Sequence, residues 1–208
     1  MLFTILDIET TGFNNKHDDI LEVGYLIVNQ DCEILRHGQF YFYQEHFKIE
    51  GSAQDVHGLT RDFLKQYEQD FTKSLARLFT LCCQAIIIGK NNRKFDMPFI
   101  DEFLKRYAYR LDEVTIKGYI DLEEFYTPIY REWYVKKYGV ATKKYGTLSE
   151  LVDIIGYPQQ QLQQEFNFLF PDISRDRAHS ALFDSYMTYT LLKDAVKNHG
   201  LELVRKRK

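Results

Sequence analysis

Four carboxylates stand in three separated segments of the chain, in surroundings that could bring them together. The segments are Asp7-Ile-Glu-Thr-Thr-Gly12, Asn92-Arg-Lys-Phe-Asp96 and His179-Ser-Ala-Leu-Phe-Asp184. Four converging carboxylates cannot all stay ionised unless positive charge lies among them. A pair of divalent metal ions is the usual source of that charge, and His179 is a candidate base near neutral pH. The set therefore predicts metal-dependent phosphodiester hydrolysis.

The first segment follows residues 2–8, an apolar run rich in β-branched and aromatic side chains that predicts a buried strand. Because strand side chains alternate, Asp7 and Glu9 are expected on the same side, where their mutual repulsion implies a cation. Thr10 and Thr11 then end the strand, and Gly12 is free to take a positive φ. The alternative for this segment alone is an acidic surface turn.

The second segment joins a predicted strand to a predicted helix. Residues 85–89 form an apolar run closed by glycine, and residues 93–107 have helical spacing, with Phe95, Phe99 and Phe103 on one face. Asp96 is therefore expected in the first turn of this helix. Its alternative role is to complement the helix dipole.

The third segment opens the last predicted helix, from about residue 178 to residue 198. Asp184 is expected one to two turns into it. Five residues span about 140° around a helix, so His179 reaches the same site only from the first turn or just before it. Its alternative is a solvated neighbour of the helix cap.

These segments together resemble the DEDDh-type, DnaQ-like 3′–5′ exonucleases, over about residues 2–195. The family's motifs Asp-x-Glu-Thr-Thr-Gly, His-Asn-x-x-Phe-Asp and His-x-Ala-x-x-Asp match at Asp7 to Gly12, at Asn92 to Asp96 and at His179 to Asp184. A further family feature appears as Val56-His57-Gly58-Leu59-Thr60. Asn91 departs from the family's usual His. The sister group has Tyr four residues before the last Asp, where this chain has Ser180, so His179 is the candidate base.

The resemblance implies a ribonuclease H-like α/β fold with a mixed five-stranded sheet flanked by helices. It also implies two Mg²⁺ or Mn²⁺ ions, held by the four acids: Asp7, Glu9, Asp96 and Asp184. The product would be a nucleoside 5′-monophosphate from single-stranded or frayed 3′ ends. The expected substrate-binding residues are Thr10, Thr11, Gly12, Phe13, His57, Asn92 and Phe95. Phe13 is expected either to stack on the terminal base or to be a plain core residue.

Two other functions compete with a DNA exonuclease. An RNA-trimming enzyme of the ribonuclease T or oligoribonuclease kind uses the same motifs, and recognition of the 2′-OH depends on pocket detail. A non-catalytic module that binds nucleic acid or a polymerase predicts loss of the catalytic set. All four acids and the histidine are present in this chain.

The length predicts a single domain over residues 1–208, which the resemblance makes an exonuclease domain, with a short basic tail at 201–208. No apolar run approaches membrane-spanning length, and no signal peptide precedes the first strand, so a cytoplasmic location is expected. The three cysteines, Cys32, Cys82 and Cys83, lack metal-ligand spacing and predict reduced, buried thiols.

The formal net charge of −3 argues at first against a nucleic-acid partner, although the metal site itself accounts for part of the acidity. Basic clusters lie at 136–137, at 143–144 and beside Asp96. The last comprises Lys90, Arg93 and Lys94, which are expected either to contact phosphate or to be solvated. Residues 158–172, rich in Gln and Phe, predict a core helix that buries Leu162, Phe166 and Phe170. The alternative is a polymerase-clamp peptide, and a polymerase or replication partner is unproven.

The remaining pattern predicts the other elements. Strands are expected at 20–29, 34–43 and 114–120, and helices at 60–66, 72–83 and 122–138, the last kinked or split by Pro128. Asp121 is expected to be structural or a helix cap. Thr147 and Glu150 form a capping box that opens another helix.

We expect His179→Ala to lower turnover by roughly 10²- to 10⁴-fold, the usual loss when a general base is removed. Metal affinity should change little, because His179 is expected to accept a proton rather than bind metal. Steady-state turnover and calorimetric Mn²⁺ titration of the same preparation measure both. A parallel collapse of metal binding would make His179 a ligand instead.

Overall fold

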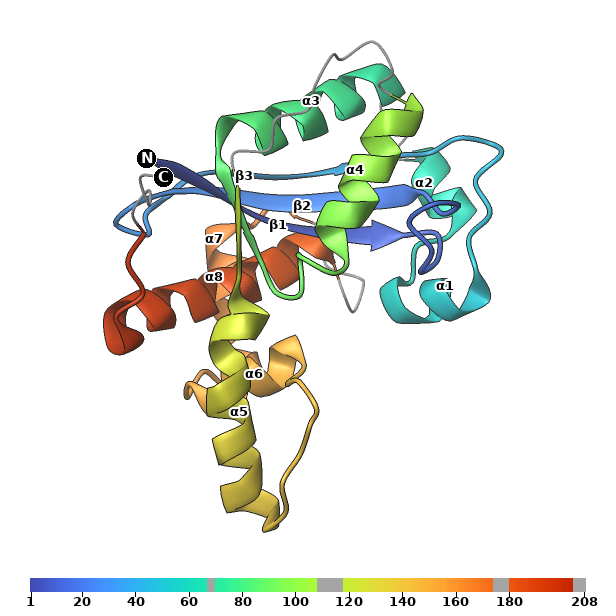
Figure 1. Cartoon of the computed structure of the whole chain (residues 1–208). Helices are drawn as coiled ribbons and strands as arrows, with labels where there is room; N and C mark the ends of the chain where they lie inside the picture. The colour runs from blue at the N-terminus through green and yellow to red at the C-terminus, as the bar shows by residue number, and fades with distance from the viewer. Residues whose placement is uncertain (67–69, 108–117, 174–179, 204–208) are drawn as a thin grey trace.

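The computed structural model describes residues 1–66, 70–107, 118–173 and 180–203, which form a five-stranded sheet with helices on both faces (Figure 1). The strands are β1 (Leu2–Thr10), β2 (Ile20–Asn29), β3 (Ile34–Tyr41), β4 (Ile86–Gly89) and β5 (Tyr119–Asp121). Their order is β3-β2-β1-β4-β5. The predicted mixed sheet flanked by helices is confirmed.

Strand β1 lies at the centre of this sheet. It pairs antiparallel with β2 and parallel with β4, and β4 in turn pairs parallel with β5. The pairing of β2 with β3 is antiparallel, so the first three strands form a meander. Because β1 and β4 run in the same direction, the segments that follow Glu9 and Gly89 emerge at the same edge of the sheet.

Eight helices lie in the described part of the chain. They are α1 (Gly51–His57), α2 (Arg61–Gln66), α3 (Phe71–Gln84), α4 (Asp96–Tyr107), α5 (Leu122–Tyr138), α6 (Leu148–Ile154), α7 (Gln159–Leu169) and α8 (Ala181–His199). Helices α3 and α4 cover one face of the sheet, α7 and α8 cover the other, and α5 extends away from it (Figure 1). No helix in the described ranges is long and apolar enough to cross a membrane.

The alternation of β1 divides the core into two apolar clusters. Phe3 and Ile5 pack with residues of α5 to α8, whereas Leu6 and Ile8 pack with residues of α3 and α4. Asp7 follows Phe3 and Ile5 in the period-two pattern, so this carboxylate faces the α8 side. The sheet therefore directs Asp7 and Glu9 together toward the last helix.

Several predicted elements differ from those observed. The fifth strand begins at Tyr119, and residues 114–117 of the predicted strand lie outside the described residues. Helix α5 runs unbroken through Pro128. Helix α1 was not predicted, because it is short and buries only Ala53 and His57, which gives no apolar periodicity. The capping box of Thr147 and Glu150 is confirmed at the start of α6.

Helix α7 confirms the prediction of a core helix for residues 158–172. Leu162 and Phe166 are fully buried, and Phe170, just after the helix, is buried as well. Phe166 and Phe170 pack edge-on against Tyr186 of α8. The three apolar side chains at fourfold spacing therefore support α8, as expected for a core helix rather than a clamp-binding peptide.

The N-terminal end of α8 lies directly on the backbone of β2 at Gly24. A Cβ atom at Gly24 would come within 2.1 Å of the Ala181 carbonyl carbon and of the Leu182 nitrogen. The hydroxyl of Ser185 donates a hydrogen bond of 3.0 Å to the Gly24 carbonyl. Gly24 is the register partner of Asp7. This close contact therefore sets how near the start of α8 can approach Asp7.

We expect Gly24→Ala to destabilise the fold by about 1–3 kcal/mol or more, because the added methyl group has no room. The matched control is Gly51→Ala, where a Cβ meets nothing within 4 Å, and it should be neutral or slightly stabilising. Urea unfolding of both variants measures the difference. Equal effects of the two substitutions would show that the α8–β2 contact is not tight.

Candidate metal centre

Three carboxylates from two elements form an acidic cluster at the carboxyl end of β1. Asp7 and Glu9 of β1 and Asp184 of α8 each offer an oxygen atom, and these atoms lie within 4.8 Å of one another. Asp184 lies in the first turn of α8, where its N–H donates to the Ser180 carbonyl at 3.0 Å. The predicted convergence of the first and third segments is therefore present in the structure.

The raised pKa of Asp7 shows that the carboxylates of this cluster repel one another. Burial raises the pKa of the Asp7 carboxyl well above its ordinary value. The charges of Asp184 and Asp96, and then of Glu9 and Glu22, raise the same pKa further. A divalent cation reverses this situation, because it favours the ionised form of every carboxylate around it.

Asp96 comes to the same region from the opposite side of the sheet. It is the first residue of α4, as predicted, and it is buried. Burial raises the pKa of Asp96 to about 7, although hydrogen bonds from its own backbone and from Ile8 act against the increase. Its Oδ1 atom is buried without a hydrogen-bond partner among the described residues. An orphaned carboxylate oxygen beside three other carboxylates fits a role in metal binding, either directly or through water.

Glu22 is a fifth carboxylate that the sequence did not reveal. It is fully buried on β2 and is the register partner of Glu9. The hydroxyl of Ser180, the N-cap residue of α8, lies 3.4 Å from a Glu22 carboxylate oxygen. The only signal in the sequence was an acid inside an apolar strand. The proximity of Glu22 to Asp7 follows from the register of β2 against β1, which the sequence of β2 alone cannot show.

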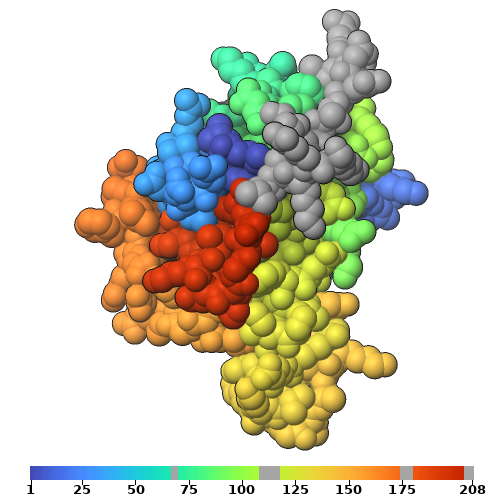
Figure 2. Space-filling model, turned by 60° about the vertical axis from the view of Figure 1, so that its left-hand side comes forward, coloured from blue at the N-terminus to red at the C-terminus, as the bar shows by residue number. Residues whose placement is uncertain are grey.

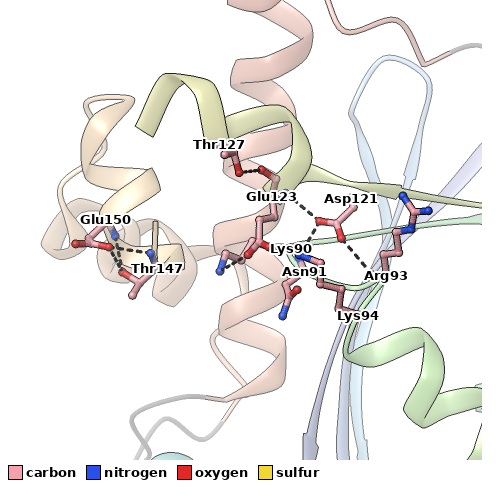
Figure 3. A network of polar contacts seen from close by, with 9 residues as sticks. All are labelled: Lys90, Asn91, Arg93, Lys94, Asp121, Glu123, Thr127, Thr147 and Glu150. Carbon is pink, nitrogen blue, oxygen red and sulfur yellow. Dashed lines mark hydrogen bonds and ion pairs between the residues drawn. The ribbon is translucent and has the colours of Figure 1, made fainter. Parts of the chain in front are cut away.

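Asp121 holds the loop that presents Asp96. Its carboxylate accepts hydrogen bonds from the backbone N–H groups of Asn91 at 2.8 Å and Arg93 at 3.1 Å (Figure 3). The same carboxylate accepts from the Glu123 N–H at 2.9 Å and so caps α5. The predicted role as a structural residue or cap is confirmed, and Asp121 also joins α5 to the β4–α4 loop.

The basic residues beside Asp96 form ion pairs with the start of α5. Lys90 lies 3.2 Å and Lys94 3.7 Å from the Glu123 carboxylate, and Arg93 lies 2.9 Å from Glu124. Figure 3 shows Lys90, Lys94 and Glu123 close to the loop that Asp121 holds. Lys90 is largely buried in its pair, whereas the Lys94 side chain is 60% exposed. Of the three, Lys94 and Arg93 are thus better placed than Lys90 to meet a phosphate.

The threonines and glycine after Glu9 form a compact turn. The Thr10 hydroxyl donates to the Gly12 carbonyl at 2.6 Å, and the Thr11 hydroxyl accepts from the Asp19 N–H at 2.9 Å. The φ of Gly12 is not positive, so the expected reason for glycine is wrong. A Cβ at Gly12 would instead come within 2.5 Å of the Asp18 carboxylate. A side chain at Gly12 would therefore require the Asp18 carboxylate to move.

Three expected substrate-binding side chains make contacts inside the protein. The Nδ1 atom of His57 accepts from the Leu59 N–H at 2.9 Å, so its Nε2–H donates to the Thr10 carbonyl at 3.1 Å. The Asn92 amide donates to the Ile120 carbonyl at 3.3 Å. Phe95 packs against Phe99 with ring centroids 4.9 Å apart. Their contact with substrate stays a prediction.

Phe13 is 63% exposed, so the alternative of a core residue is wrong. It directly follows the turn that begins at the acidic cluster, which is consistent with a stacking role. His179 lies outside the described residues, and so does any contact that it makes. Cys32 and Cys82 are buried, as predicted, and Cys83 is partly buried.

Solved structures of exonuclease I share the fold of this chain. Exonuclease I of E. coli, in a zinc-bound complex with single-stranded DNA, superimposes with a TM-score of 0.70 at 17% identity, covering 96% of this chain and 41% of that chain. Its complex with a dT13 oligonucleotide gives 0.69 at 17% identity, covering 96% and 42%. This likeness confirms the ribonuclease H-like fold.

The family model for the exonuclease RNase T matches residues 4–192. The chain belongs to this family of exonucleases, which confirms the resemblance based on its motifs. Mitochondrial oligoribonuclease of Homo sapiens is 28% identical over 166 residues, 72% of this chain and 65% of that protein. The PolC-type DNA polymerase III of Staphylococcus haemolyticus is 28% identical over 144 residues, 69% of this chain and 10% of that protein. The chain thus spans less than two thirds of the oligoribonuclease.

We expect Asp96→Asn to stabilise the metal-free protein by roughly 2–4 kcal/mol at pH 8, because a carboxyl group with a raised pKa opposes folding when ionised. The folded-state pKa is about 7 and the ordinary value is 3.8. The advantage of the variant should therefore shrink as the pH falls from about 7 towards 4, where wild-type Asp96 is also neutral. Urea unfolding in EDTA at several pH values measures this dependence, and a pH-independent difference would contradict it.

Proposed function

We propose that this chain is a metal-dependent 3′–5′ exonuclease that hydrolyses single-stranded or frayed 3′ ends of DNA to nucleoside 5′-monophosphates. The observation that carries the proposal is the cluster of the partly buried Asp7, Glu9 and Asp184, whose oxygens lie within 4.8 Å of one another. Membership of the exonuclease family supplies the reaction class.

The residues present fit a pair of divalent ions. Asp7, Glu9 and Asp184 would hold them, and Asp96 would support the site with its otherwise unpartnered oxygen. Two bound Mg²⁺ or Mn²⁺ ions would supply the positive charge that lowers the pKa of the attacking water and stabilises the departing 3′ oxygen. Which metal is bound stays part of the proposal.

The proton from the attacking water is assigned to His179, which directly precedes the N-cap residue Ser180 of α8. A histidine is suited to this transfer because its ordinary pKa lies near neutral pH. The contact between Ser180 and buried Glu22 ties the start of α8 to β2.

A single-stranded end is the preferred substrate in this proposal. Phe13 is 63% exposed and follows the turn after Glu9 in the chain, and an aromatic face accepts any base. Stacking the terminal base requires it to leave its partner, which costs a few kcal/mol in a duplex and almost nothing in a single strand. Thr10, Thr11, Gly12, His57, Asn92 and Phe95 would shape the surrounding pocket.

An RNA-trimming enzyme is the second candidate. It is favoured by the similarity to mitochondrial oligoribonuclease, which extends over 166 residues. The relatives of the PolC type favour DNA, and they also motivate the further proposal of a polymerase partner. Exonuclease I, whose fold this chain shares, is bound to single-stranded DNA in one structure and to a dT13 oligonucleotide in another, consistent with the first candidate.

We expect the purified chain, with Mg²⁺ or Mn²⁺, to release mononucleotides from the 3′ end of a 5′-labelled single strand faster than from a blunt duplex. A 3′ phosphate should slow the release. Matched DNA and RNA oligomers of one sequence decide between the two candidates by their kcat/KM values. Gel separation of the labelled products makes each measurement.

The control is Asp7→Ala, which should abolish this activity while leaving the metal-free fold as stable or more stable, because mutual repulsion is relieved. A thermal melt in EDTA checks the fold. Near wild-type turnover of Asp7→Ala would contradict the metal-dependent mechanism. Cleavage of a circular single strand would contradict exonuclease action, because a circle has no end.

A further inference from the structure

The second half of α5 and the loop that follows it carry a concentration of positive charge that the metal site does not use. We name residues 130–147 the basic arm. It contains five cations, Arg131, Lys136, Lys137, Lys143 and Lys144, and one acid, Glu132, whereas the whole chain has a net charge of −3. The arm projects from the molecule at the bottom of Figure 2, away from the exposed face of α8.

Most of this charge is not neutralised within the protein. Lys136 pairs with Glu132 at 2.8 Å, one turn earlier on the same helix. Lys137, Lys143 and Lys144 are exposed, and none of them has an ion pair with an acidic residue in the described ranges. Unpaired cations gathered on one part of a chain with a negative net charge favour the binding of an anionic partner.

Aromatic side chains lie between these cations. Trp133 is the only tryptophan in the chain, and Lys137 Nζ lies 4.5 Å from its ring centroid and 5.3 Å from that of Tyr138. Tyr138 is 52% exposed and Tyr145 is 49% exposed. Cations interleaved with exposed flat rings are the features with which proteins hold single-stranded nucleic acid.

A continuous series of contacts joins the arm to the metal centre. Lys94, two residues before Asp96, lies 4.7 Å from the ring centroid of Tyr145, and Arg131 lies 5.6 Å from the same ring. Arg131 then donates a hydrogen bond of 3.2 Å to the Lys143 carbonyl. The arm and the loop that presents Asp96 are therefore one surface.

We propose that the basic arm binds the single-stranded polynucleotide that trails behind the 3′ terminus held at the acidic cluster. The inference rests on the proposed function for the position of that terminus. The lysines contact successive phosphates, and Tyr138 stacks on a base. A polynucleotide satisfies both features because it repeats one anion and one flat ring at each unit.

The length of α5 makes the proposal testable with short substrates. Its 17 residues extend about 25 Å at 1.5 Å per residue. With stacked bases, a trinucleotide spans only about 10 Å at roughly 3.4 Å per nucleotide, and a twelve-nucleotide strand about 40 Å. A thymidine trinucleotide held by its 3′ end therefore cannot reach the end of the arm, whereas a thymidine 12-mer can.

The first test compares Lys143→Ala/Lys144→Ala with the control Lys73→Ala/Lys105→Ala. The control removes the same charge from exposed positions on α3 and α4, which lie opposite α5 in Figure 1. Fluorescence anisotropy with a labelled thymidine 12-mer in metal-free buffer measures binding over a range of salt. For two lost phosphate contacts, the slope of log K against log salt should fall by roughly 1.4 in the arm variant only.

Hydrolysis with metal gives a second readout. The arm variant should raise KM for the 12-mer with kcat unchanged, because it loses binding that ground state and transition state share. Tyr138→Ala, which changes the far end of α5, should hydrolyse the trinucleotide at the wild-type kcat/KM, because the trinucleotide does not extend to that end. If the wild-type protein hydrolyses neither oligomer, the proposed function is wrong. The anisotropy data would still show whether the basic arm binds the 12-mer.

The second test separates stacking from charge. Tyr138→Ala should weaken 12-mer binding by about 5- to 100-fold with little change in the salt slope, and Tyr138→Phe should restore it. Equal weakening by the arm and control lysine variants would overturn the proposal. Unchanged 12-mer binding by the arm variants would also overturn it. Sedimentation that shows self-association of the wild-type protein, lost in the arm variants, would overturn it as well, because the arm would then bind a second copy of the chain.

Discussion

Electrostatic repulsion among carboxylates at the end of β1 is the constraint on which the rest of the arrangement depends. Asp7 is partly buried, and desolvation together with the charges of Asp184 and Asp96 raises its pKa well above the ordinary value. Such a site persists without metal only if packing elsewhere holds the elements together. The contact of α8 with Gly24 and the apolar packing of α7 on α8 supply that support. The fold therefore holds a group of carboxylates at the end of β1 that favours the binding of a cation.

The parts of the site that depend on one segment were predictable from sequence. Alternation along a strand placed Asp7 and Glu9 on one side, and helical spacing placed Asp96 in a first turn. Glu22 was not predictable, because its proximity to Asp7 depends on the register of β2 against β1. The close approach of Asp18 to Gly12 was missed likewise, since it requires the position of Asp18, which a later turn sets.

Charges beside the site have two different roles that sequence alone could not separate. Lys90 and Lys94 pair with Glu123, so part of the basic cluster next to Asp96 neutralises the start of α5. The lysines farther along the chain, Lys143 and Lys144, have no such partner in the described ranges. Both groups look alike as basic pairs in the sequence. Only the position of α5 relative to the β4–α4 loop, fixed by Asp121, distinguishes them.

The distance along the chain between Asp7 and Asp184 has a consequence for folding kinetics. Strand β1 can pair with β2 early, because the two are near in sequence, whereas the acidic cluster is complete only after α8 docks on Gly24. Contacts between distant parts of a chain form late, since loop closure must precede them. A metal ion that needs both carboxylates then stabilises the native state more than the folding transition state. Bound metal should therefore slow unfolding while leaving the rate of folding almost unchanged.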